Sequence, residues 1–157
     1  MDTDVLVILL GKYADILSTY RDAEIWIRFG TGTSLQNIHL RSVYEKLGVN
    51  MSKGLPFFHS FTGCDAVSSF KGKAKKSAWL TWKSFTTATD VFRGLKHLQK
   101  FVVQMYSKGL DVESVNEARK ILFGQNQNVE RLPPTADALL QHTKRSIHQA
   151  GKFKNGK

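Results

Sequence analysis

The sequence predicts a mixed α/β start followed by a mostly α-helical second half. Residues 24–40 have the pattern of a β-hairpin, because residues 24–29 alternate and are rich in β-forming side chains, and residues 30–33 have turn chemistry. From residue 55 onward, apolar side chains recur at helical spacing instead. A chain of 157 residues with a hydrophobic content of 41% is long and apolar enough for one packed domain.

The first half is expected to hold the hairpin and short helices. Residues 5–10 form a continuous apolar run, whose periodicity does not distinguish a buried strand from a buried helix. The other expected elements are a strand at 24–29, its hairpin partner at 36–40, a short helix at 41–47 that Gly48 stops, and a helix at 55–61 that ends near Gly63.

The second half is predicted to hold four helices, of which the last three are separated by glycine or proline. Their expected positions are residues 78–82, 92–106, 115–122 and 136–147. No repeat and no linker divides residues 1–150, so we expect one domain there. Residues 151–157 are rich in Gly, Lys and Asn, and we expect a disordered basic tail.

The net charge of +10 favours a polyanionic partner, most simply nucleic acid. Residues 51–100 hold nine basic and two acidic side chains, whereas residues 1–50 hold five and six. The middle third is therefore the candidate nucleic-acid face. Solubility alone, or attraction to an anionic membrane surface, is the simpler alternative. The apolar run at 5–10 is too short to span a membrane, and no membrane partner is expected.

The single cysteine, Cys64, excludes an internal disulfide and a multi-cysteine zinc site. It is compatible with a reducing compartment. We therefore expect an intracellular location, with the nucleus as the more specific hypothesis.

Three aspartates are the candidate catalytic and metal-binding residues. Asp2 and Asp4 project from one short stretch of backbone, and Asp65 follows some sixty residues later. Mg²⁺ and Mn²⁺ take oxygen ligands from carboxylates, and paired metal ions can clamp the attacking and leaving oxygens of a phosphodiester. The alternatives are solvated carboxylates near a helix N-terminus for Asp2 and Asp4, and an N-cap for Asp65.

A basic loop directly after Asp65 is the candidate phosphate-binding segment. Hydroxyl groups, lysines and backbone N–H groups are the usual contacts to a nucleic-acid backbone. The residues expected to make these contacts are Ser68, Ser69, Lys71, Gly72, Lys73, Lys75 and Lys76. The alternative is a solvated charged face.

Residues 2–10 and 55–82 resemble the second half of a PIN-like nuclease domain of the flap endonuclease and 5′-nuclease superfamily. The matching motifs are Asp2-Thr3-Asp4 with the apolar run after it, Phe61-Thr62-Gly63-Cys64-Asp65, and the stretch from Phe70 to Lys76. The resemblance implies Asp2, Asp4 and Asp65 as ligands of Mg²⁺ or Mn²⁺. It also implies a partial PIN-like sheet in the first 65 residues and a helix-hairpin-helix-like element near residues 65–82.

The superfamily takes further acidic ligands from a preceding half of the domain, so the resemblance predicts an N-terminally truncated domain. Over nearly its full length the chain also resembles a group of uncharacterised animal proteins that occur in many genomic copies. The shared features are His59, the Thr-Gly-Cys-Asp motif, the stretch at 75–79 and the pattern at 133–145. A gene fragment derived from a mobile element is therefore an alternative interpretation.

The leading functional hypothesis is a nucleic-acid-binding, flap-nuclease-like module with an incomplete metal site and weak or no activity alone. DNA is favoured over RNA as the partner. If active, the chain would be a Mg²⁺- or Mn²⁺-dependent, structure-specific nuclease. The rival hypothesis is a non-enzymatic module that binds nucleic acid or another protein.

Five further side chains are expected to have structural roles. His59 is interpreted as a hydrogen-bonded core or boundary histidine, and Cys64 as a small buried residue. Trp79 and Trp82 are expected to pack in the core. His142 is expected on an exposed basic face of the last helix.

Overall fold

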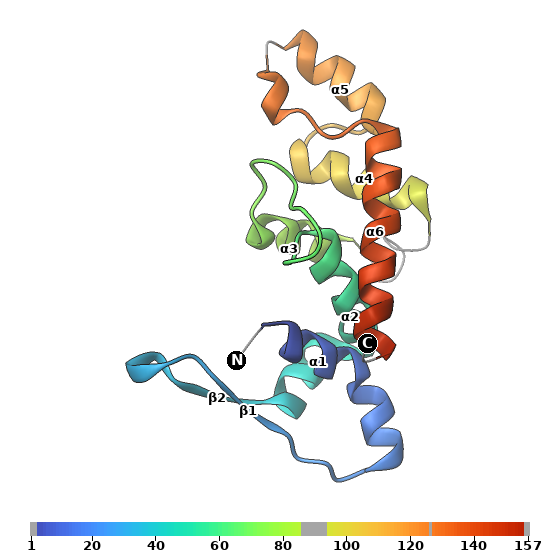
Figure 1. The fold of residues 1–157 in the computed structure, drawn as a ribbon. Helices are drawn as coiled ribbons and strands as arrows, with labels where there is room; N and C mark the ends of the chain where they lie inside the picture. Colours follow the sequence, from blue (N-terminus) through green and yellow to red (C-terminus); the bar gives the residue numbers. More distant parts are fainter. Residues whose placement is uncertain (1–2, 86–93, 126, 156–157) are drawn as a thin grey trace. The chain divides into compact units, whose positions relative to one another are not determined.

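The computed structural model describes residues 3–85, 94–125 and 127–155 of the chain (Figure 1). The chain forms two compact units, of which the first comprises residues 1–59 with 150–157 and the second residues 60–149. Helices predominate, and the sheet in the described residues is a two-stranded antiparallel hairpin. The predicted mixed start and helical remainder are confirmed at this level.

The first unit begins with helix α1 (Thr3–Thr19) and continues through the hairpin to α2 (Leu40–Phe61). The apolar run at residues 5–10 lies within α1, so the helical alternative is the correct one. Leu10 and Tyr13 are buried in the core of this unit, and Leu6 and Leu17 pack against the same cluster. Residues at these intervals lie on one face of a helix, and the pattern continues beyond the apolar run, which ends at residue 10.

The hairpin pairs β1 (Trp26–Phe29) with β2 (Gln36–His39), and a 3₁₀ turn at Gly32–Ser34 lies between the two strands. The predicted hairpin is therefore confirmed. Ile27 is buried against Leu10 and Tyr13, because alternate residues of a strand point to opposite faces. Trp26 therefore faces solvent.

Helix α2 contains both helices predicted in this region. Its backbone leaves the helical conformation at Gly48, where φ is 77° and ψ is 163°. A residue without Cβ adopts this conformation readily, which explains why the predicted stop is a kink within a longer helical segment. Pro56 lies further along α2, and its ring contacts α1.

The second unit is built from helices, and the four that the sequence predicts are present. They are α3 (Lys75–Ser84), α4 (Leu95–Tyr106), α5 (Val115–Gly124) and α6 (Ala136–Asn155), with a 3₁₀ turn at Val129–Arg131 before the last. Helix α4 packs against α3 and α5. Residues 92 and 93, predicted to begin the second of these helices, lie outside the described residues. Phe61, Trp82 and Phe101 are fully buried in this unit.

Helix α6 is longer than predicted. Residues 151–155 continue the helix, so the disordered tail expected there is wrong for these residues. Ala150 and Phe153 are buried, and this burial favours the helical conformation where composition alone suggests disorder. Residues 156 and 157 lie outside the described residues.

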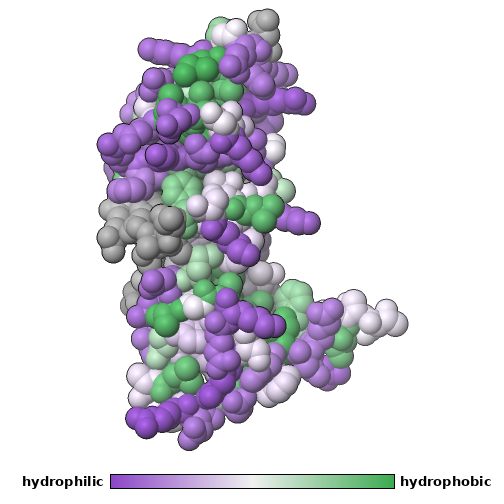
Figure 2. Space-filling view, turned by 180° about the vertical axis from the view of Figure 1, so that it is seen from behind, coloured by the Kyte–Doolittle hydropathy of each residue, from purple (hydrophilic) through white to green (hydrophobic). Residues whose placement is uncertain are grey.

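Figure 2 shows one face of the molecule, on which hydrophilic residues (purple) predominate and hydrophobic residues (green) form small separate groups. Within the described residues, no helix is both long enough and apolar enough to cross a membrane.

Candidate functional site

The loop between α2 and α3 is shaped by two glycine-dependent turns. Cys64 and Val67 exchange backbone hydrogen bonds of 2.9 and 3.2 Å, which leaves Asp65 exposed at the tip of a tight turn. Gly63 precedes this turn with φ of 108°, and a Cβ there would lie 2.7 Å from Ser69 Cβ. The glycine therefore allows the loop to fold back closely on itself.

A second turn brings the loop to the start of α3. The N–H of Lys73 donates to the carbonyl of Phe70 at 3.1 Å, and Gly72 has a φ of 72°. A positive φ at the third position of such a turn favours glycine. Gly72 thus has a conformational role, whereas Lys71 and Lys73 supply charge.

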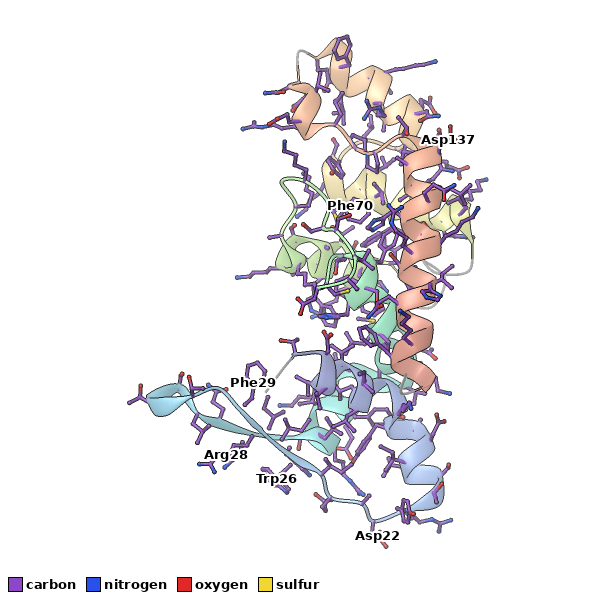
Figure 3. The ribbon with its side chains drawn as sticks, viewed as in Figure 1. Asp22, Trp26, Arg28, Phe29, Phe70 and Asp137 are labelled. Atoms are coloured by element: carbon purple, nitrogen blue, oxygen red, sulfur yellow. The ribbon has the colours of Figure 1, made fainter. Side chains whose placement is uncertain are left out.

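Phe70 anchors the loop to the core of the second unit. Its ring centroid lies 5.1 Å from that of Phe61 and 4.8 Å from that of His142, both at steep angles. Figure 3 shows Phe70 lying between the loop and α6. His142 Nε2 donates to the carbonyl oxygen of Phe61 at 2.7 Å. These contacts hold a polar, lysine-rich segment in one place.

The folded loop and the start of α3 line an open hollow with a volume of about 510 Å³. Its lining combines backbone, hydroxyl groups, one carboxylate and two lysines. The residues are Thr62, Gly63, Cys64, Asp65, Val67, Ser68, Ser69, Lys73, Ala74 and Lys75. Four of the seven predicted phosphate contacts therefore lie on one concave surface.

The beginning of α3 gives this hollow a positive character. Ala74 precedes the helix and offers no side-chain acceptor to its first N–H groups, and the first turn holds no acidic residue. Lys75 and Lys76 occupy that turn instead. Lysines at a helix N-terminus oppose the helix dipole, and the same arrangement attracts an anion.

Two lysines among the predicted phosphate contacts, Lys71 and Lys73, also interact with other residues of the protein. Lys71 Nζ lies 2.8 Å from Glu130 Oε1, and this interaction lowers the pKa of Glu130. Lys73 Nζ donates to the carbonyl of Tyr106 at 3.4 Å and lies 4.7 Å from the centre of its ring. Burial, and then the charge of Arg131, lowers the pKa of Lys73. Gly72 and Lys76 line neither of the two hollows in this region.

A second hollow, of about 330 Å³, lies on the other side of Ser68 and Ser69. Tyr106, Glu130, His142 and Arg145 contribute to its lining. These four residues are not among those predicted from the sequence to form a site. They come from three separate segments of the chain, and no local motif marks them.

The structure does not assemble the predicted metal site from described residues. Asp2 lies outside them, Asp4 belongs to the first unit and Asp65 to the second. Over residues 3–85, 94–125 and 127–155, no group of three or more His, Cys, Asp or Glu side chains is placed to hold a metal ion. Mg²⁺ or Mn²⁺ binding therefore stays a prediction.

Asp4 has a nearby partner in its own unit. His59 Nε2 donates to Asp4 Oδ1 at 2.6 Å, and the side chain of His59 is only 10% exposed. The hydrogen-bonded boundary role predicted for His59 is confirmed. This pair connects the first turn of α1 to α2, which is a structural function.

Three other structural expectations have different outcomes. Trp82 is fully buried, as predicted, and Trp79 is partly buried with its ring 5.3 Å from that of Trp82. Cys64 is half-buried, because it lies in the loop at the edge of the hollow. His142 is buried between two phenylalanines, so the exposed face predicted for it is wrong.

Comparison of the chain with protein-family models, curated proteins and solved structures finds no match.

Proposed function

We propose that the chain is a nucleic-acid-binding module that holds the sugar–phosphate backbone in the hollow between the 62–74 loop and the start of α3. The observation that carries the proposal is the convergence of Ser68, Ser69, Lys73 and Lys75 on one concave surface beside the N-terminus of α3, where Ala74 makes no side-chain cap hydrogen bond. Hydroxyls, N–H groups and lysines recognise phosphate oxygens without reading base sequence. DNA remains the favoured nucleic acid.

The charge of the second unit supports the same proposal. Residues 60–149 carry fourteen Lys and Arg and seven Asp and Glu. A surplus of positive charge attracts a polyanion and accelerates its association. Asp65 opposes this attraction locally, because its carboxylate also lines the hollow.

Binding of this kind needs no metal ion. Cleavage by the flap-nuclease-like chemistry that the resemblance implies would require a donor set that the described residues do not form. We therefore propose binding as the function of these residues, with weak or absent cleavage by the chain alone. The location expected for a nucleic-acid-binding protein is nuclear.

The test is duplex binding by the full chain and its Lys75→Gln/Lys76→Gln variant, measured by fluorescence anisotropy over a range of salt concentrations. The slope of log K against log salt is negative, and each lost phosphate contact makes it shallower by about 0.9. We expect the double variant to bind several-fold more weakly at low salt, with a slope shallower by at least about 0.9, because Lys75 lines the hollow and Lys76 lies beside it in the first turn of α3. Chelating divalent cations should leave binding by the wild type unchanged.

Two further variants make the test specific. Lys108→Gln/Lys120→Gln removes the same charge from exposed positions elsewhere in the second unit, and it should retain the wild-type slope. Asp65→Asn should tighten duplex binding up to about fivefold, because it removes a repulsive charge from the hollow. The proposal fails if both double variants lose affinity equally. It also fails if binding requires Mg²⁺ and is lost in Asp65→Asn.

A further inference from the structure

An exposed tryptophan lies on the outer face of the hairpin in the first unit. The side chain of Trp26 is 63% exposed. Its ring stacks on the imidazole of His39, the residue opposite it in the strand register, with centroids 4.5 Å apart and planes 20° apart. Most of the indole surface therefore faces solvent while the ring rests on a second flat ring.

The supporting histidine is fixed in place by both of its ring nitrogens. His39 Nδ1 lies 2.7 Å from Ser42 Oγ, and Nε2 interacts with the carboxylate of Glu24. Arg41 Nε in turn lies 3.2 Å from the other oxygen of Glu24. Because the imidazole cannot rotate without breaking these contacts, the indole has a fixed ring to stack on, which reduces the entropic cost of stacking a further ring on it.

The same face carries a cation and an amide. Arg28 follows Trp26 by two residues and therefore points to the same side of the strand, and Asn37 is its partner across the hairpin. Figure 3 shows Trp26 and Arg28 on one side of the hairpin and Phe29 on the other. Arg28 and Asn37 are both exposed.

We propose that this hairpin face binds an unpaired nucleotide of a nucleic-acid strand. The base stacks on Trp26, Arg28 pairs with the adjacent phosphate, and the Asn37 amide hydrogen-bonds to the base edge. Every base has a π-face, so stacking on an aromatic side chain accepts any sequence. A guanidinium matches the geometry of phosphate oxygens. An apolar protein partner is disfavoured, because Trp26 is surrounded on this face by polar groups.

This inference is independent of the phosphate-binding loop. The hairpin residues and the loop residues belong to different compact units of the chain. Bases within a duplex are already stacked, so the hairpin face distinguishes single strands, whereas the loop contacts the backbone that both forms share. The chain would then have one site for backbone and another for unpaired bases.

The experiment compares three probes by fluorescence anisotropy: a labelled twelve-nucleotide oligothymidine, an abasic strand of the same length and a twelve-base-pair duplex. The wild type should bind the oligothymidine more tightly than the abasic strand. Trp26→Ala should lower affinity for the oligothymidine about tenfold or more and abolish this preference, and Trp26→Phe should retain most of it. Duplex binding should be unchanged in Trp26→Ala and weakened in Lys75→Gln/Lys76→Gln.

Val49→Ala is the matched control, because Val49 is an exposed apolar residue of the same unit, at 47% exposure. The inference is overturned if Trp26→Ala binds the oligothymidine as Val49→Ala does, or if the wild type binds the abasic strand equally well. It is also overturned if Trp26→Ala changes only the sedimentation of the protein alone. That result would assign the face to contact between copies of the chain.

Discussion

His142 is one of the residues that fix the position of the 62–74 loop. It packs against Phe61 and Phe70 and donates to the carbonyl of Phe61, so it connects α6 to both ends of the segment that forms most of the lining of the hollow. Burial lowers its pKa, more than the hydrogen bond to Phe61 raises it, and the charge of Arg145 lowers it further. The folded protein therefore favours the neutral form of the His142 imidazole.

The buried His142 should make stability depend on pH. Its pKa in the unfolded chain is about 6.5 and its folded pKa is lower, so the unfolded chain takes up the proton first. The contribution of the neutral ring is complete above about pH 6.5 and is lost as the pH falls toward the folded pKa. We expect the midpoint of urea unfolding to decrease between pH 7.5 and pH 5.5.

His142→Gln should reduce this decrease, because glutamine keeps a donor for Phe61 but does not titrate. His148→Gln, at an exposed position of the same helix, should keep the full decrease. An equal pH dependence in both variants would show that His142 does not cause it.

Features that depend only on neighbouring residues in the sequence were predictable. The glycine at position 72 within a run of lysines predicts a turn, and a turn is present. The pairing of Lys71 with Glu130, and of Lys73 with the end of α4, was not predictable. Partners that lie 30 to 60 residues apart leave no spacing rule in the sequence.

At the scale of elements, the close packing of α1 against α2 restricts the size of the residue at position 11. Gly11 lies within α1, and a Cβ there would be 2.5 Å from Pro56 Cγ and 3.1 Å from Pro56 Cδ. The pyrrolidine ring cannot rotate away as a long side chain would. Gly11 therefore allows close approach of the two helices.

Gly11→Ala should destabilise the protein by about 1–3 kcal/mol, the usual cost of overpacking. Gly151→Ala should instead stabilise it by about 1 kcal/mol, because Gly151 lies within α6, no atom is within 4 Å of a Cβ there, and alanine favours helix. Urea unfolding of both variants measures the difference. Equal shifts of the same sign would contradict the described contact between Gly11 and Pro56.

The elements were predictable where apolar spacing or turn residues mark them. The hairpin follows directly from such marks, and Gly48, predicted to end a helix, marks a kink within α2 instead. In α6 the apolar pattern was right for Leu139 and Thr143, which are buried, but wrong for Ile147, which is 57% exposed, whereas Ser146 is fully buried. Ser146 Oγ donates to the carbonyl of His142 at 2.9 Å, and a hydroxyl satisfied within its own helix is inexpensive to bury.

At the scale of the whole molecule, the two proposed sites lie in different compact units. The loop site in the second unit combines positive charge with backbone N–H groups, and the hairpin site in the first unit combines an aromatic platform with Arg28. A single strand could engage both kinds of chemistry, whereas a duplex engages only the first. The sequence predicted the loop site from its lysines, but the hairpin site depends on a cross-strand register that only the structure gives.

The central claim is that phosphate backbone occupies the hollow lined by the 62–75 segment. The most direct measurement is a titration of the isotope-labelled chain with a short DNA duplex, followed by backbone amide NMR. The account predicts that the largest shift changes occur at Ser68, Ser69 and the first turn of α3, with and without Mg²⁺. Shift changes confined to other elements, with these amides unaffected at saturation, would contradict it.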